Sequence, residues 1–214
     1  MATLYSLEQL SMLSGVADIH KLSLKLLQDY YKVHLMPYTY EFKLSGQTTI
    51  KLNFPKAQFC HLLAIEKIMT LQNRQTKHAK KYKGIKGYEN IENFILTFDS
   101  LNKGLHRSYF RKNENKFLFF HLLHKLIEKP VLIDYEPSIV NPSSKIEADF
   151  VFYDVISDNY IHLGVVRKNK FVNEYVPRSW FIQPKGDKYI DKFVNGQTQI
   201  NFKKMQKKEI ILPS

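Results

Sequence analysis

Cysteine is almost absent from this sequence. Cys60 is the only one among 214 residues. A single thiol cannot form a disulfide within the chain, and such sparing use of cysteine is typical of a reducing compartment. The sequence also has no run of eighteen apolar residues and no basic N-terminal segment followed by an apolar core. We therefore expect a cytoplasmic protein without a membrane-spanning helix.

Recognisable metal-binding motifs are also missing. Neither His-Glu-x-x-His nor Cys-x-x-Cys occurs, and no acidic cluster has the spacing of a two-metal site. His121 and His124 lie three residues apart and could share one helix face, but no third ligand follows at a recognisable spacing. These absences favour ordinary packing for both histidines and argue against two-metal hydrolysis. We expect no metal and no other cofactor.

Acidic residues are few relative to basic ones. The chain has 20 Asp and Glu against 32 Lys and Arg, which gives a formal net charge of +12. Such an excess attracts polyanions, because each neutralised phosphate releases condensed counterions. Nucleic acid is the partner that this charge favours. The alternative is a merely solvated basic surface.

Glycine and proline are sparse, and 44% of the residues are apolar. A chain of this size can build one good-sized core, so we expect a single domain over residues 1–214, with residues 1–36 packed on it as N-terminal helices. Helical spacing of apolar residues follows a capping pattern at Ser6 and Gln9. The same spacing predicts further helices at 16–33, 56–72, 88–98 and 117–127.

Alternating apolar and polar residues predict the strands. Residues 38–44 and 48–54 read as a β-hairpin, and 131–135, 148–153, 160–166 and 178–182 as an antiparallel meander. A short helix at 190–194 and a basic strand near the C-terminus complete the pattern. We predict an α+β fold in which an antiparallel sheet of about four to six strands packs on the N-terminal and central helices.

Two segments combine cations with aromatic residues. The loop at 74–88 contains tyrosines, glycines and six cations without an acid, and the segment 106–112 is similarly basic and aromatic. Ammonium groups bind phosphates and tyrosines can stack on unpaired bases, so both segments suit a nucleic-acid strand with unpaired bases. The predicted nucleic-acid-binding residues are Arg74, Lys77, Lys80, Lys81, Lys83, Lys86, Arg107, Arg111 and, from the C-terminal region, Gln197.

His61 and Lys67 interrupt an otherwise apolar helix within the segment 54–68. Desolvation lowers the pKa of such side chains, which is one way to obtain an acid or a base near neutral pH. At about 100° per residue the two side chains lie about 120° apart, so they need not serve one pocket. The plainer interpretation of His61 is a hydrogen-bonded core histidine.

This segment resembles the Phe-x-His-Leu-x-Gly-x-x-Lys motif of the phage-encoded barnase-EndoU-colicin-RelE-like nucleases, abbreviated PBECR, and specifically their fourth group. Further similar pieces are Tyr160-Ile-His162-Leu-Gly164, residues 175–181, and Tyr189 with Gly196-Gln197. Ala64 stands where the motif favours glycine, Glu66 where a histidine is common, and Trp180 where a phenylalanine is expected. The similarity extends from about Leu22 to Phe202.

The resemblance implies a barnase/RelE-like sheet packed on helices and a metal-independent nuclease acting on RNA. Cleavage by the 2′-hydroxyl needs a base, an acid and groups that stabilise charge on the phosphate. We predict His61 and His162 as acid–base residues, Lys67 and Arg167 as electrostatic stabilisers, and Ser179 with Gln197 as phosphate donors. Glu66 is an alternative base, and strand-end or turn bonding is the alternative role of Ser179 and Gln197.

Three functions stay open at this point. The first is an endoribonuclease of phage or mobile-element origin that acts as a toxin or in phage–host conflict. The second is a catalytically silent nucleic-acid-binding protein of the same fold, which the departures at Ala64 and Glu66 favour. The third is an interaction protein, such as an inhibitor that binds an acidic or nucleic-acid-loaded host complex through a basic face. An inhibitor or a host protein is a candidate partner.

Overall fold

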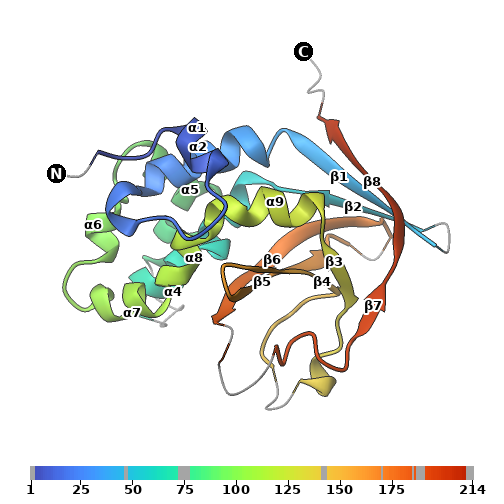
Figure 1. Cartoon of the computed structure of the whole chain (residues 1–214). Helices are drawn as coiled ribbons and strands as arrows, with labels where there is room; N and C mark the ends of the chain where they lie inside the picture. The colour runs from blue at the N-terminus through green and yellow to red at the C-terminus, as the bar shows by residue number, and fades with distance from the viewer. Residues whose placement is uncertain are drawn as a thin grey trace. The chain divides into compact units, whose positions relative to one another are not determined.

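The computed structural model describes residues 3–45, 48–71, 78–140, 144–169, 171–184, 186 and 191–210 (Figure 1). The chain divides into two compact units. The helical unit comprises Met1–His34 and Pro55–Leu122, and the sheet unit comprises Leu35–Phe54 and Leu123–Ser214. Each unit is discontinuous in sequence, because residues 35–54 belong to the sheet unit and interrupt the helical unit.

The helical unit consists of short helices. A capping box starts the first of them, with reciprocal hydrogen bonds between Ser6 and Gln9 as predicted. In chain order the elements are α1 (Leu7–Met12), η1 (Ile19–Lys21), α2 (Leu24–His34), η2 (Lys56–Gln58), α3 (Phe59–Leu62), α4 (Ile65–Met69), η3 (Ala79–Tyr82), α5 (Gly84–Glu92), α6 (Phe98–Leu101), α7 (His106–Lys112), α8 (Glu114–Leu118) and η4 (Phe120–Leu122).

Several predicted helices are shorter than their apolar spacing suggested. The helix predicted at 16–33 begins only at Leu24, after a turn that Asp18 caps. The helix at 56–72 is broken at Ala64, whose φ of 55° is left-handed. The helix at 88–98 runs instead from Gly84 to Glu92 and ends before Phe94, which also has a positive φ. The segment 117–127 divides into parts of α8, η4 and α9.

Aromatic residues form the core of the helical unit. Tyr31 packs against Phe59 and Phe120, with ring centroids 5.2 and 6.1 Å away, and Phe59 also meets Tyr88 at 5.8 Å. The helices α3 and α5 approach closely beside this cluster. A Cβ at Gly87 would lie 2.8 Å from the Cys60 sulfur and 2.7 Å from the carbonyl carbon of Tyr82, so only glycine fits there.

The sheet unit holds eight strands in one sheet, with the order β7-β3-β4-β5-β6-β2-β1-β8. Its helix α9 (Leu123–Glu128) lies against β4, and the turn η5 (Pro137–Ile139) follows β3. The strands are β1 (Tyr38–Leu44), β2 (Thr49–Asn53), β3 (Val131–Asp134), β4 (Phe150–Ile156), β5 (Asn159–Arg167), β6 (Glu174–Pro184), β7 (Thr198–Ile200) and β8 (Phe202–Glu209).

The α+β class, the β1–β2 hairpin, the antiparallel β4–β5–β6 meander and the basic C-terminal strand are confirmed. The prediction of four to six strands was too low, since β7 is only three residues long and carries little alternation. The parallel pairing of β2 with β6 was not predicted either, because register between distant segments leaves no local pattern. Residues 191–196 form turns rather than the predicted helix, whose first residue lies outside the described ranges.

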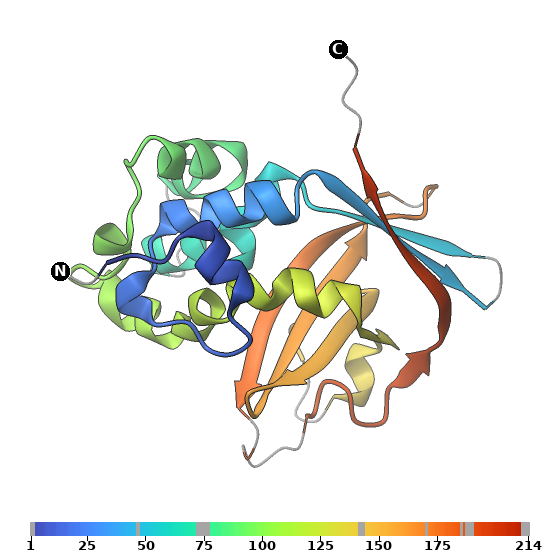
Figure 2. The ribbon, with the colours of Figure 1, turned by 45° about the horizontal axis from the view of Figure 1, so that its top comes forward.

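The sheet twists strongly, and the β1–β2 hairpin runs across the direction of β4, β5 and β6 (Figure 2). Buried aromatic residues fill one face, including Phe42 and Phe152 with ring centroids 5.0 Å apart, and Trp180 with no exposed surface. A smaller cluster around Ile133, Tyr135, Val140 and Val151 packs with Phe193. No helix in the described part of the chain is long and apolar enough to cross a membrane.

Candidate functional site

His61 and Lys67 lie on two different short helices, α3 and α4. The left-handed residue Ala64 separates them and accounts for the break, because it ends one helix and begins the next. An L-residue with a side chain pays roughly 1–2 kcal/mol for this conformation, whereas glycine pays almost nothing. His61 is half-buried and Lys67 is exposed. The family's preference for glycine at this position therefore has a backbone cause.

Glu66 is engaged in an ion pair. Its Oε1 lies 3.0 Å from the Nζ of Lys83, and its side chain is 15% exposed against 47% for the lysine. The carboxylate also helps to raise the pKa of the nearby Cys60 thiol to about 12, although burial is the larger cause. Glu66 is thus held by a cation.

Lys116 on α8 is a cation with a clearly shifted pKa. Burial and, secondarily, the positive charge of Lys67 lower its pKa to about 8. A bound anion reduces the repulsion between two such like charges. The sequence did not single out Lys116, because its proximity to Lys67 arises from tertiary packing.

The basic segment 74–88 is only partly a loop. Arg74 and Lys77 lie outside the described residues, whereas Lys80 and Lys81 are exposed on η3. Lys83 precedes α5 and pairs with Glu66, and Lys86 lies 3.3 Å from Glu89. Two of the four described lysines are therefore partly neutralised within the protein.

Arg107 and Arg111 are exposed on α7. Both η3 and α7 contact α4 within the helical unit. The cations of η3 and α7 are thereby gathered around the helix that carries Lys67. This arrangement is suited to a polyanion that spans more than one phosphate.

His162 lies in the interior of the sheet unit. Its ring has no exposed surface, stacks on Phe181 with centroids 4.4 Å apart, and places Nε2 3.0 Å from Oδ1 of Asp191. Tyr153 and Phe193 border the same ring. Among the described residues neither Nδ1 of His162 nor Oδ2 of Asp191 has a hydrogen-bond partner. The imidazole therefore has no direct route to a substrate in this arrangement.

Ser179 lies opposite Gly164 in the β5–β6 ladder, next to the pair formed by His162 and Phe181. A Cβ at Gly164 would lie 3.1 Å from the Cβ of Ala148 and 3.2 Å from that of Ser179. The glycine in the Tyr160-Ile-His162-Leu-Gly164 segment thus allows three chain segments to pack closely. Ser179 is half-buried on the same face of the sheet as His162.

Arg167 ends β5 and is exposed. Its Nε and Nη2 donate to the hydroxyl of Tyr175 at 3.1 and 2.9 Å, and this contact, followed by the negative charge of Asp149, holds the pKa of the guanidinium above its usual value. Asp149, Val166, Arg167 and Asn169 line an open hollow of about 560 Å³. The exposed guanidinium and the carboxylate of Asp149 thus share this hollow.

The side-chain oxygen and nitrogen of Gln197 both form hydrogen bonds with the backbone of Glu136. Its Oε1 accepts from the Glu136 amide at 2.8 Å, and its Nε2 donates to the Glu136 carbonyl at 2.9 Å. These bonds tie the segment before β7 to the turn after β3. The turn-bonding role that the sequence left open for this residue is the one that the contacts describe.

The predicted catalytic residues are divided between the two units. His61 and Lys67 belong to the helical unit, and His162, Arg167 and Ser179 to the sheet unit. Within the sheet unit, His162 and Ser179 share a face of the sheet. The convergence of both sets on one phosphate stays a prediction. Across the described ranges no group of three or more His, Cys, Asp or Glu side chains is placed to hold a metal ion.

Comparison with protein families matches residues 24–212 to PBECR4, described as phage-Barnase-EndoU-ColicinE5/D-RelE like nuclease4. The chain belongs to this family. The match includes segments of both units, so the family's pattern is not confined to one of them. No curated protein and no solved structure matches the chain. PBECR4 membership indicates nuclease activity and hence a nucleic-acid substrate, and the family's description points to phages as its source.

Proposed function

We propose that this PBECR4 protein is a metal-independent endoribonuclease whose phosphate site includes Lys67 and Lys116 of the helical unit. The observation that carries the proposal is the lowered pKa of Lys116 beside Lys67, at the position of the family's motif lysine. A cation whose pKa is lowered by burial and by a second cation is typical of sites that bind an anion or exchange a proton. The net charge of +12 would attract an RNA strand to such a site.

The proposed mechanism follows from the chemistry of RNA. A base removes the proton of the 2′-hydroxyl, the oxygen attacks the adjacent phosphorus, and an acid protonates the departing 5′-oxygen. His61 is the proposed acid–base residue. Lys67 neutralises charge on the phosphate oxygens, and Lys116, with a pKa of about 8, can exchange a proton in the neutral range. The products would be a 2′,3′-cyclic phosphate and a 5′-hydroxyl end.

In the sheet unit, the phosphate-binding roles predicted for Arg167 and Ser179 are kept, and the role of His162 changes. Arg167 and Ser179 are proposed phosphate contacts, since the first is exposed and the second half-buried. The complete burial of His162 weighs against proton transfer directly from its ring and favours a role in positioning the Asp191 turn. Each assignment is testable by its own substitution.

The deciding experiment uses labelled RNA in the presence of EDTA, together with the same strand carrying 2′-deoxyribose throughout. The proposal requires cleavage of the RNA only and cyclic-phosphate ends on the products. Lys67→Met is expected to lower the rate roughly 100-fold, as loss of one stabilising group does in comparable sites. Lys32→Met is the control, because Lys32 is an exposed lysine of α2 outside the proposed site. Cleavage of the deoxy strand would contradict the mechanism.

A second candidate, nucleic-acid binding without cleavage, has one specific observation in its favour. Glu66 replaces the histidine that is common in the family's motif and is held by Lys83 in an ion pair. If that histidine were required for proton transfer, the chain would bind but not cut. Retention of intact RNA on the protein at low salt, with no product after long incubation, would support this reading.

A further inference from the structure

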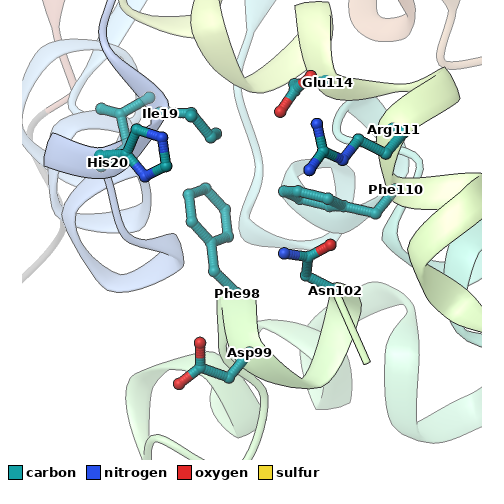
Figure 3. A pocket seen from close by; sticks show the side chains of 9 residues that line it. Ile19, His20, Phe98, Asp99, Asn102, Phe110, Arg111 and Glu114 are labelled. Atoms are coloured by element: carbon teal, nitrogen blue, oxygen red, sulfur yellow. The ribbon is translucent and has the colours of Figure 1, made fainter. Parts of the chain in front are cut away.

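A cavity of about 270 Å³ lies within the helical unit, between η1, α6, α7 and α8. Its aromatic surface comes from Phe98 and Phe110, which belong to a triad with Phe117. The three ring centroids are 5.2–5.6 Å apart. Phe98 is half-buried whereas Phe110 and Phe117 are buried, so Phe98 offers the accessible ring. Figure 3 shows this ring standing in the middle of the cavity.

Polar side chains surround the aromatic surface. Asn102, Arg111 and Glu114 direct their amide, guanidinium and carboxylate groups into the same space (Figure 3). Within the described ranges, no hydrogen bond or ion pair to another residue engages these three side chains. They offer both donors and an acceptor to a ligand that is flat enough to lie against Phe98.

The charges of the cavity exclude a phosphate as its main occupant. Two carboxylates, Asp99 and Glu114, line it and would repel an anion, while Arg111 opposes a purely cationic ligand and His20 adds an imidazole. An uncharged planar ring with donors and acceptors on its edge satisfies all of these groups. The volume is slightly below the range of roughly 300–1,000 Å³ that drug-sized ligands occupy, so it suits one such ring.

We propose that this cavity is a base-binding subsite, in which one unpaired nucleobase of the nucleic-acid strand stacks on Phe98 while Arg111, Glu114 and Asn102 contact its edge. The subsite rests on the proposed function for its ligand. It is separate from the Lys67–Lys116 pair, because Glu114 and Lys116 are two positions apart on α8 and point about 160° apart around the helix. The polar groups would distinguish bases, whereas the ring accepts any of them.

The test measures binding of the four ribonucleoside 5′-monophosphates and of ribose 5-phosphate to the full chain by NMR titration at physiological salt. Nucleotides should bind and ribose 5-phosphate should not. Phe98→Leu keeps an apolar side chain in the triad but removes the stacking surface, and it should weaken all four nucleotides by about tenfold or more. Glu114→Gln exchanges an acceptor for an amide and should change the order of the four affinities.

Phe94→Leu is the matched control, because Phe94 is 67% exposed and does not line the cavity. Equal binding of ribose 5-phosphate and nucleotides, or an unchanged order of affinities in Glu114→Gln, would overturn the subsite. Cleavage of RNA by a protein that shows no nucleotide binding here would leave the proposed function standing without the subsite. Nucleotide binding of the expected pattern without any cleavage of RNA would support the subsite and contradict the proposed nuclease activity.

Discussion

Lys116 is half-buried, and desolvation together with the like charge of Lys67 lowers the pKa of Lys116 to about 8. The relationship joins the motif lysine of the family to a residue that no sequence pattern marked. A protein retains such a repulsive pair at a cost in stability. Binding of a phosphate between the two ammonium groups would offset that cost.

The pH dependence of stability provides a first prediction. The pKa of Lys116 is lower in the folded chain than the ordinary value of 10.5, so between about pH 8 and 10.5 the unfolded chain binds more protons and stability rises with pH. Below pH 8, Lys116 is charged in the folded chain, and the destabilisation that this charge causes is present in full. Lys116→Met should therefore raise the free energy of unfolding at pH 7, by an amount on the order of a few kcal/mol at most, and raise it less at pH 10. Urea denaturation at both pH values measures this, and an equal gain at both would contradict the account.

The left-handed Ala64 gives a second prediction. Ala64→Gly should stabilise the protein by about 1 kcal/mol, because glycine adopts a φ of 55° without the clash that a Cβ causes. Ala57→Gly is the control, since Ala57 lies in η2 without a positive φ and should lose stability on the same change. The urea midpoints of the two variants, compared with that of the unchanged protein, measure the gain and the loss. A loss of stability in both variants would show that Ala64 carries no strain.

The close approach of α3 and α5 gives a third. Gly87→Ala should destabilise the helical unit by roughly 2–3 kcal/mol or more, because the new methyl group meets Tyr82 backbone at 2.7 Å and cannot be relieved by a side-chain rotation. Gly104→Ala provides the comparison, as its φ of 54° is strained but no atom lies within 4 Å of the added Cβ. Thermal unfolding should show the larger loss of stability for Gly87→Ala. Equal losses in the two variants would contradict a steric clash at Gly87.

The buried pair of His162 and Asp191 gives a fourth. His162→Ala should cost about 3–5 kcal/mol, since it removes a stacked ring and leaves the Asp191 carboxylate buried without its partner. The double variant with Asp191→Asn should recover part of the loss, because an amide is less costly to bury than an unpaired carboxylate. Calorimetry of the single and double variants tests the coupling. A double variant as unstable as the sum of both losses would mean that the pair is not coupled.

Activity separates a positioning role of His162 from direct proton transfer. A His162→Gln variant that remains folded should keep a measurable rate and an unaltered pH profile if the imidazole only positions the Asp191 turn. Loss of one limb of the pH profile would instead assign proton transfer to His162. Measurement of the rate from pH 5 to 9 makes the distinction.

The sequence predicted those parts of the fold that have a local cause. The capping box at Ser6, the β1–β2 hairpin and the β4–β6 meander follow from side-chain chemistry and alternation within a few residues. Helix ends were predicted poorly, because apolar spacing continues through Ala64 while its backbone does not. The parallel β2–β6 contact depends on segments that are distant in sequence and could not be inferred from either one.

The candidate site residues also divide into those with a local sequence signal and those that depend on distant segments. His61 and Lys67 were identified because charged residues interrupt an apolar segment and match a family motif. Lys116 and the cavity around Phe98 were not, because each depends on neighbours that folding brings together. The burial of His162 was not predicted, since a histidine within an alternating strand reads the same whether or not another segment covers it.

The most direct test of the phosphate site is the pKa of Lys116 itself, measured by NMR with and without an RNA analogue that carries 2′-deoxyribose and cannot be cleaved. The account predicts a value near 8 in the free protein and a clear rise toward the ordinary lysine value in the complex, with Lys67→Met raising it already in the free protein. A pKa that is unchanged by saturating oligonucleotide would contradict the claim that a phosphate binds between Lys67 and Lys116.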